Sequence, residues 1–232
     1  MTALLASVRS AEEALDAAGA GADLIDLKEP REGALGGVSI DNIWRIARTL
    51  RSRHPVKPIS ATIGDLPPDA IDAIAARATE VGETGVDFVK VGVVPGPHAR
   101  ACLTRIAGLQ ATVLPVLLCD DGVDASLVLH AAALRFVGIV FDTAGKTGRT
   151  LFDCIDGATL ARYIATIRAS GAMACIAGSL GWTQLDGIRA LAPDVAGFRT
   201  ALCENGRTSR LDPRRVTQWA DALHHAAPGA AA

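Results

Sequence analysis

The stretch "ADLIDLKEPREGALGGVSIDNIWRIARTLRSR" (residues 22–53) predicts a strand, a glycine-rich loop and a helix, in that order. The strand, residues 22–28, is apolar on both faces apart from a few charged residues, and Asp26 and Lys28 lie at its end. Strands of this kind are typical of parallel sheets that helices cover on both sides. The helix, residues 39–53, is amphipathic, and its apolar face carries Ile40, Ile43, Trp44, Ile46, Ala47 and Leu50. The stretch therefore predicts one β/α unit of a parallel α/β fold.

The same alternation of apolar runs and amphipathic stretches continues along the whole chain. The candidate strands are residues 3–8, 22–28, 58–63, 86–93, 112–118, 136–142, 172–178 and 195–199. The candidate helices are residues 10–21, 39–53, 67–85, 98–109, 124–133, 157–170, 182–191 and 213–226. Eight such units in 232 residues predict an α/β protein that forms one domain, a (β/α)₈ TIM barrel. A doubly wound open sheet is the alternative, but no G-x-G-x-x-G motif follows the first strand.

The ends of this domain are predicted from composition and capping residues. We expect residues 1–226 to form the barrel and residues 227–232, which are mostly alanine, to form a disordered tail. At the other end, Ser10 followed by Glu13 three residues later predicts a capping box at the start of the first helix.

Composition excludes several classes of function. The net charge of -2, with both signs mixed along the chain, is unlike the basic face of a nucleic-acid-binding protein. No apolar stretch approaches the about 18 residues of a membrane span, and the N-terminus lacks the basic region of a signal peptide. The five cysteines are widely spaced and odd in number, which predicts reduced thiols in a cytoplasmic protein. None of the five histidines has a carboxylate or cysteine at a metal-ligand spacing, so we expect no metal and no other cofactor.

Charged residues gather at predicted strand ends, where barrels of this kind place their catalytic groups. They are Asp26, Lys28, Lys90, Asp142 and, in the following loop, Lys146. Alternation along a strand puts Asp26 and Lys28 on the same side, toward the barrel mouth. One interpretation is a structural network that pairs Asp26 with a lysine and Asp142 with Lys146. The other is catalytic, because a lysine beside other cations in a desolvated pocket has a lowered pKa and attacks carbonyls to form a Schiff base.

Two glycine-containing segments follow the last two predicted strands, where many barrels bind phosphate. Gly178 and Ser179 offer a close backbone approach and a hydroxyl group. Arg199 and Arg207 offer guanidinium groups that match a phosphate. Each glycine is also compatible with an ordinary turn. Taken together, the segments predict a phosphorylated substrate.

Five blocks of the chain resemble one family. They are "DLKEPREGALGG" (26–37), "DFVKVGV" (87–93), "FDTAGKTGRTLFD" (141–153), "IAGSL" (176–180) and "GFRTALCENGRTSRLD" (197–212). In this order they resemble the (5-formylfuran-3-yl)methyl phosphate synthase family of methanofuran biosynthesis. One difference is Glu29, where archaeal members carry asparagine.

The resemblance implies an enzyme on a (β/α)₈ barrel that condenses two molecules of glyceraldehyde 3-phosphate into 4-(hydroxymethyl)-2-furancarboxaldehyde phosphate. One phosphate and two waters are eliminated. The product serves the biosynthesis of methanofuran or a methanofuran-like C1 carrier. By the same resemblance, Lys28 forms the Schiff base and Lys90 is the proton acceptor. Asp26, Asp142 and Lys146 would then assist proton transfers, phosphate departure and ring closure, and no cofactor is implied.

Two alternatives stay open from the sequence. One is a class I aldolase or a sugar-phosphate isomerase on the same barrel, which would share the phosphate site. The other is a non-catalytic sensor of a phosphorylated ligand, which would form no Schiff base. In the favoured interpretation the protein is a cytoplasmic homo-oligomer that acts on a small triose phosphate, and it binds neither nucleic acid nor membrane.

Overall fold

The computed structural model describes residues 1–145 and 148–225, and its centre is a closed barrel of parallel strands. The strands are β1 Ala3–Val8, β2 Leu24–Leu27, β3 Ile59–Thr62, β4 Phe88–Val93, β5 Val113–Leu118, β6 Gly138–Asp142, β7 Met173–Ile176 and β8 Val195–Phe198. Each strand pairs with the next in the chain, and β1 also pairs with β8. The predicted (β/α)₈ barrel is thus confirmed, and closure of the sheet excludes the open doubly wound alternative.

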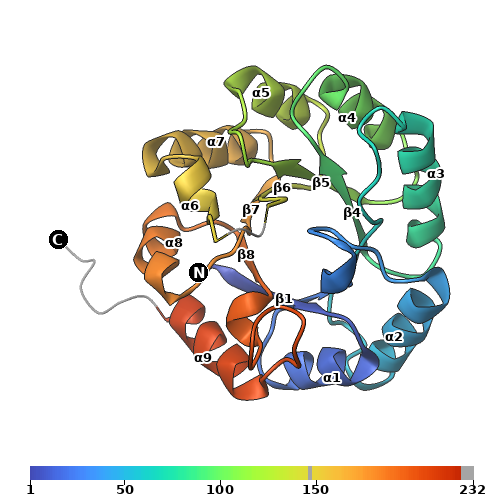
Figure 1. The fold of residues 1–232 in the computed structure, drawn as a ribbon, viewed down its shortest axis with the longest axis vertical. Coiled ribbons are helices and arrows are strands. Elements are labelled where there is room, and N and C mark those ends of the chain that lie inside the picture. The colour runs from blue at the N-terminus through green and yellow to red at the C-terminus, as the bar shows by residue number, and fades with distance from the viewer. Residues whose placement is uncertain (146–147, 226–232) are drawn as a thin grey trace.

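Helices surround the strands, and Figure 1 looks along the barrel at these two rings. The α-helices are α1 Ala11–Gly19, α2 Ile40–Arg53, α3 Ile71–Gly82, α4 Ala99–Ala107, α5 Ala125–Ala133, α6 Leu151–Cys154, α7 Gly157–Ala169, α8 Leu185–Leu191 and α9 Pro213–His224. Three 3₁₀ turns, η1 Pro30–Glu32, η2 Trp182–Gln184 and η3 Thr200–Leu202, follow β2, β7 and β8. The short helix α6 and these turns were not predicted, because three or four residues are too few to show a period. No helix in the described ranges is long and apolar enough to cross a membrane.

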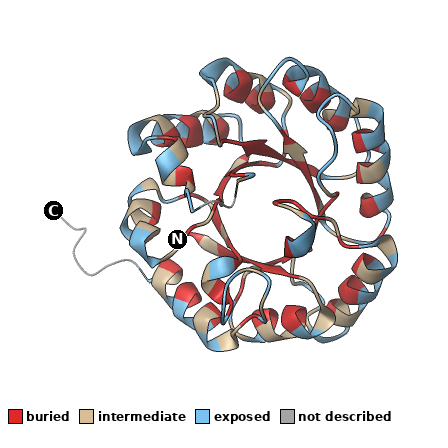
Figure 2. Ribbon diagram, in the orientation of Figure 1, coloured by how far each residue is buried: buried red, intermediate tan, exposed pale blue. Residues whose placement is uncertain are grey.

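The strands separate two apolar layers, and in Figure 2 they are coloured as buried while the helices expose their outer sides. Ile25 and Leu27 pack against the helices in the outer layer. Leu24 belongs to the smaller cluster inside the barrel. Asp26 and Lys28 share the side of Leu24, since side chains alternate along a strand. The alternation predicted for this strand is therefore the one that the fold adopts.

The last helix covers the seam where the first and last strands meet. Trp219 of α9 is fully buried, and its ring lies 4.3 Å from the ring of Phe198 in β8. The Trp219 ring also stacks on Trp182, with ring centroids 4.1 Å apart, although Trp182 is half exposed. Trp219 thus joins the end of the chain to the barrel wall.

We expect Trp219→Ala to lower the free energy of unfolding by about 3–5 kcal/mol, because it leaves a large cavity between α9 and β8. Trp182→Ala removes the same ring from a half-exposed position, so its effect is expected to be clearly smaller. Urea unfolding followed by circular dichroism measures both. Equal losses for the two variants would contradict the role given to Trp219.

Candidate active site

The centre of the site is the carboxylate of Asp26, which is completely buried inside the barrel. In the strand register Asp26 of β2 lies opposite Ser7 of β1 and Ser60 of β3. Its Oδ1 accepts a hydrogen bond from the Ser60 hydroxyl at 2.6 Å. Its Oδ2 accepts from the Ser7 hydroxyl at 3.0 Å and from the Lys90 ammonium at 3.1 Å. Four strands thus contribute to one polar cluster, and this is how the fold compensates the cost of burying the charge.

The surroundings favour the ionised form of this carboxylate. Burial alone raises the pKa of Asp26, but the charges of Lys90 and Lys28 and the hydrogen bond from Ser60 outweigh burial and lower the pKa below its ordinary value. Asp26 is therefore a fixed negative charge beneath the lysines.

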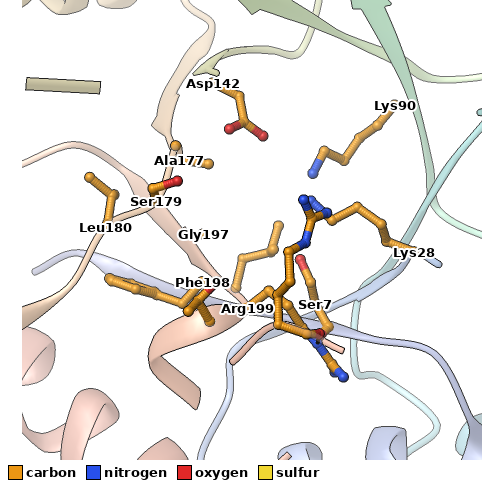
Figure 3. A pocket seen from close by; sticks show the side chains of 14 residues that line it. Ser7, Lys28, Lys90, Asp142, Ala177, Ser179, Leu180, Gly197, Phe198 and Arg199 are labelled. Carbon is orange, nitrogen blue, oxygen red and sulfur yellow. Dashed lines mark hydrogen bonds between the residues drawn. The ribbon is translucent and has the colours of Figure 1, made fainter. Parts of the chain in front are cut away.

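The two predicted lysines meet at one cavity. Lys28 is 7% exposed and Lys90 is 3% exposed, and both line the cavity together with Asp142 at the end of β6. In Figure 3 the side chains of Lys28 and Lys90 converge, and Asp142 lies across the cavity from them. Thr62 of β3 lies opposite Lys90 in the register, and continuing the β2–β3 register by one residue places Lys28 opposite Thr62. The amines therefore arise from one layer of the barrel, just above Asp26.

The predicted group Lys146 lies outside the described residues, but the loop that leads to it is held from β5. Asp120 follows β5, and its two carboxylate oxygens accept hydrogen bonds of 2.6 Å from the amides of Ala144 and Gly145. Asp142 accepts a hydrogen bond of 2.7 Å from the amide of Thr143. Asp120 is thus a support of the loop after β6. In the sequence, the only indication of this role is that Asp120 comes two residues after the end of an apolar strand.

A thiol inside the barrel is not a competing nucleophile. Cys175 of β7 is buried in the interior cluster. Burial raises the pKa of its thiol to about 12, and the charge of Lys90 opposes this only in part. The reactive form of a thiol is the thiolate, so this group stays inert near neutral pH.

The segment after β7 has the backbone shape of an anion site. Gly178 has φ +101° and Ser179 has φ 52°, so two consecutive residues are left-handed. A Cβ on Gly178 would lie 3.2 Å from Leu151 and from Thr143, which leaves little room for a side chain. In the described ranges no acceptor takes a hydrogen bond from the amides of Ser179 and Leu180. Amides exposed by such a turn suit a phosphate.

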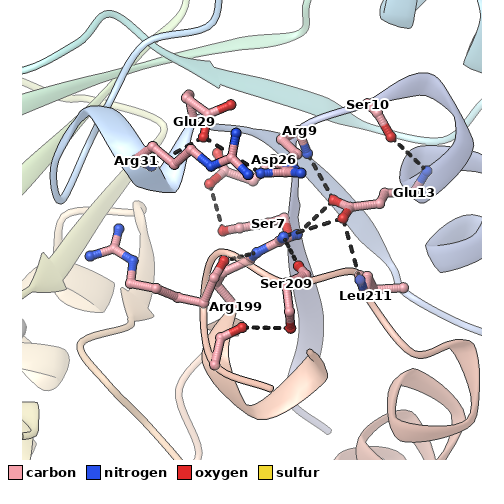
Figure 4. Close-up of polar contacts among 12 residues, drawn as sticks. Ser7, Arg9, Ser10, Glu13, Asp26, Glu29, Arg31, Arg199, Ser209 and Leu211 are labelled. Carbon is pink, nitrogen blue, oxygen red and sulfur yellow. Dashed lines mark hydrogen bonds and ion pairs between the residues drawn. The ribbon is translucent and has the colours of Figure 1, made fainter. Parts of the chain in front are cut away.

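Arg199 lines the cavity but is fully engaged elsewhere, as Figure 4 shows. Its guanidinium group makes five hydrogen bonds, two to the carboxylate of Glu13 and three to the backbone oxygens of Ser7, Arg207 and Ser209. A guanidinium group has five N–H donors, so this geometry leaves none for a ligand. The expected phosphate contact of Arg199 is therefore not supported by the structure, and Arg199 instead holds the loop after β8.

Glu13, the carboxylate partner of Arg199, forms only part of the capping box that the sequence predicts. The hydroxyl of Ser10 caps α1 by accepting from the amide of Glu13, as the capping box predicts. The carboxylate of Glu13 does not return to Ser10, and it accepts instead from the amides of Arg9 and Leu211 and from Arg199. Burial raises the pKa of Glu13, but hydrogen bonding and charge from Arg199 outweigh it and lower the pKa. Only half of the capping box forms, because the buried arginine is the stronger partner.

Arg207 lies in the loop that Arg199 holds, and it faces the cavity. Its Nη2 donates a hydrogen bond of 2.8 Å to the carbonyl of Gly33, in the loop after β2. Burial lowers the pKa of this guanidinium group, and the nearby Asp142 carboxylate opposes that effect. The structure thus brings Arg207, Asp142 and the two lysines to one cavity.

Three polar residues that support the site were not expected there from the sequence. Ser7 and Ser60 each appear as one hydroxyl in an apolar strand, and only the register shows that both face Asp26. Glu13 looks like an ordinary capping residue until its distant partner is known. In the described part of the chain, no group of three or more His, Cys, Asp or Glu side chains could hold a metal ion.

Comparisons with known proteins agree on one family. A family model described as 4-HFC-P synthase matches residues 4–220. The chain is 38% identical over 221 residues to a putative (5-formylfuran-3-yl)methyl phosphate synthase of Methylorubrum extorquens, covering 95% of this chain and 91% of that one. It is 30% identical over 236 residues to (5-formylfuran-3-yl)methyl phosphate synthase of Archaeoglobus fulgidus, covering 95% of this chain and 99% of that one.

Solved structures show the same fold at low sequence identity. Phosphoribosyl anthranilate isomerase from Thermus thermophilus superposes with a TM-score of 0.66 at 13% identity, covering 97% of this chain and 98% of that one. 3-Hexulose-6-phosphate synthase from Salmonella typhimurium superposes with a TM-score of 0.62 at 16% identity, covering 97% of this chain and 100% of that one. These similarities establish the barrel architecture.

We expect Asp26→Asn to lower the free energy of unfolding at pH 7 by about 3–5 kcal/mol, because it leaves the Lys90 ammonium buried beside a neutral amide. The pKa of Asp26 is lower in the folded protein than its ordinary value of 3.8. Its carboxylate therefore stabilises the fold above pH 3.8, and this contribution is lost as the pH falls through the lowered value. The difference between wild type and variant should accordingly be constant at neutral pH and shrink in acid.

Urea unfolding of both proteins from pH 7 to pH 3 measures this difference. Asp186→Asn, on the exposed side of α8, is the matched control and should differ little from wild type. A difference between wild type and Asp26→Asn that stays constant down to the lowest pH would disprove the assignment.

Proposed function

This chain belongs to the 4-HFC-P synthase family, and from that premise we propose which side chains perform each step of the reaction. As a member it is an enzyme that condenses glyceraldehyde 3-phosphate into (5-formylfuran-3-yl)methyl phosphate in methanofuran biosynthesis. Two three-carbon substrates supply the six carbons of the product. One phosphate is retained, and the other is eliminated with two waters.

The observation that carries the proposal is the convergence of Lys28 and Lys90 on one cavity above a buried carboxylate. The Nζ of Lys90 is held 3.1 Å from Asp26, a geometry that suits a group that accepts and returns a proton. Lys28 follows the end of β2 at the barrel mouth, where its amine can reach a substrate carbonyl. We therefore assign Lys28 as the nucleophile and Lys90 as the proton acceptor.

The reaction begins when the Lys28 amine attacks the aldehyde of one glyceraldehyde 3-phosphate, and water leaves to form an imine. Lys90, which has given its ammonium proton to that departing water, then removes a proton from the adjacent carbon to form an enamine. The enamine electron pair expels phosphate from the third carbon and leaves an enol. The terminal carbon of this enol attacks the ketone carbon of the second triose phosphate, in its isomerised form, and this bond gives the branched carbon skeleton of the furan. Asp142 at the end of β6, and Lys146, move protons during phosphate departure and ring closure.

The retained phosphate lies at the other end of the cavity. The amides of Ser179 and Leu180, the Ser179 hydroxyl and the Arg207 guanidinium group are its proposed contacts, with Gly178 allowing the close approach. Arg199 acts one step away, since it fixes the backbone of Arg207 through a hydrogen bond of 2.8 Å to the Arg207 carbonyl. No cofactor is required by this scheme, because the iminium group is the electron sink.

We expect borohydride reduction in the presence of glyceraldehyde 3-phosphate to attach a triose adduct to Lys28. Peptide mass spectrometry locates the adduct. Lys28→Arg keeps the positive charge but should abolish the adduct and the furan product, because a guanidinium group does not act as an amine nucleophile near neutral pH. Formation of the furan is followed by its near-ultraviolet absorption. An adduct on another lysine, or furan formation by Lys28→Arg, would reject the assignment.

We expect Arg207→Gln to raise KM for glyceraldehyde 3-phosphate by about 10- to 100-fold, which corresponds to about 1.5–3 kcal/mol for one charged hydrogen bond. The phosphate is bound before and during the reaction, so kcat should change less than KM. Arg210→Gln in the same loop is the matched control, because Arg210 is exposed and pairs with Glu12 and Asp16. Steady-state kinetics distinguish the two, and an equal change in both variants would refute a phosphate contact at Arg207.

A further inference from the structure

The loop after β2 places one apolar side chain inside the barrel. Leu35 is 1% exposed and belongs to the interior cluster, whose other buried members in the described residues all come from strands. Those members are Leu5, Leu114, Val116, Leu118, Val140, Cys175 and Val195. In Figure 1 the blue segment that precedes α2 turns inward toward β4. A loop side chain thus completes the packing of the barrel at its mouth.

Leu35 occupies the space above Lys90. A Cβ on Gly92 would lie 2.7 Å from Cδ1 of Leu35 and 3.7 Å from Cδ1 of Leu118. Gly92 follows Lys90 by two residues on β4, so it faces the same side, about 6.6 Å closer to the mouth. Leu118 lies opposite Asp142 in the register of β5 and β6. Leu35 therefore fills the side of the mouth between β4 and β5, next to two proposed catalytic groups.

The loop is held so that Leu35 keeps this position. The amide of Leu35 donates to the carboxylate of Asp65 at 3.3 Å, and the carbonyl of Gly36 accepts from the Glu29 amide at 2.8 Å and from the Thr62 hydroxyl at 3.0 Å. A Cβ on Gly36 would lie 2.2 Å from the Glu29 carbonyl oxygen, so only glycine allows the loop to close this tightly.

The cavity lies on the other side of the barrel mouth. Its wall comes mainly from β1, β8 and the loops after β7 and β8, and Lys28, Lys90 and Asp142 reach into it from β2, β4 and β6. No residue of β5 lines it. The position of Leu35 between β4 and β5 accounts for this asymmetry.

We propose that Leu35 is a positioning residue of the condensation, whose side chain confines the two triose phosphates to the side of the barrel that carries the phosphate loops. The inference rests on the proposed function and names a wall of the same site. Confinement matters after phosphate has left the first triose, because the resulting enol must meet the second triose phosphate before another reaction consumes it.

The competing reaction is loss of the first triose after its phosphate has left and before condensation. The electron pair of the enamine moves to form a new carbon–carbon double bond, the carbon–oxygen bond to phosphate breaks, and phosphate leaves with that bonding pair. Hydrolysis of the remaining imine consumes the water released when the imine formed. One triose phosphate then gives one methylglyoxal and one inorganic phosphate. Condensation releases one phosphate per furan, so a phosphate-to-furan ratio above one measures the leak.

We expect Leu35→Ala to form the borohydride-trapped imine on Lys28 as wild type does, but to lose furan formation by roughly 10- to 100-fold. Its phosphate-to-furan ratio should rise above that of wild type by at least about twofold, and methylglyoxal should appear. Malachite-green phosphate assay and near-ultraviolet absorption give the ratio. A ratio of one in this variant would overturn the inference.

Gly92→Ala tests the same contact without removing a core side chain, since the new methyl group displaces Leu35. We expect it to raise the ratio less than Leu35→Ala does. In the double variant the new methyl group enters the space that Leu35 has left, so the ratio should return toward one. Such non-additivity is expected only for groups that touch. Additive effects of the two substitutions would overturn the inference. Where Leu35→Ala does not fold, an unchanged ratio in Gly92→Ala would overturn it.

Leu103→Ala in α4 is the matched control for lost packing. Leu103 is fully buried in the outer layer, and its truncation removes the same three carbons far from the mouth. It should lower Tm and leave the ratio at one. A raised ratio in Leu103→Ala would show general loosening and reject a role for Leu35. Absence of the Lys28 adduct in wild type would reject the proposed function instead, so the two failures are distinguishable.

Discussion

The carboxylate of Asp26 has no access to water, so its charge must be compensated by the protein alone. The partners come from the two neighbouring strands, through Ser7 and Ser60, and from β4, through Lys90. A barrel can supply them because its strands present inward side chains in layers. One buried charge thus fixes where two hydroxyl groups and the Lys90 ammonium group lie, and Lys28 arises two residues further along β2, at the same level of the barrel as Lys90.

The protein contains a second buried ion pair with a different role. Glu13 and Arg199 lie 2.6 Å apart at closest approach, and both are nearly inaccessible. Every donor of the arginine is engaged with carboxylate or backbone oxygens, so the pair joins α1, β1 and the loop after β8. The pair of Asp26 and Lys90 includes an amine that lines the cavity. Saturation of hydrogen bonds, more than burial or charge, distinguishes Arg199 from Lys90, the proposed proton acceptor.

Sequence patterns predicted the parts of this protein that depend on periodicity. The alternation within residues 22–28 placed Asp26 and Lys28 correctly, and repetition of the β/α unit predicted the barrel. The patterns could not show that Arg199 is saturated, because its partners Glu13 and Ser7 lie more than 180 residues away in the chain. They also gave no sign of Leu35, since a loop has no period that assigns a side to its residues. The saturation of Arg199 and the position of Leu35 escaped prediction because both depend on contacts between segments that are far apart in the sequence.

Those loops do not act independently of one another. The loop after β2 is fixed from within by Gly36, from β3 by Thr62 and from the segment after β3 by Asp65. On its cavity side it is tied to the loop after β8, through the hydrogen bond from Arg207 to Gly33. The guanidinium group proposed to hold phosphate therefore also contacts the loop that carries Leu35. A ligand that draws Arg207 toward itself changes this bond, so binding at the phosphate end is mechanically connected to the wall above Lys90. The hydrogen bond between the two loops therefore joins the proposed phosphate end of the cavity to the loop that places Leu35 above Lys90.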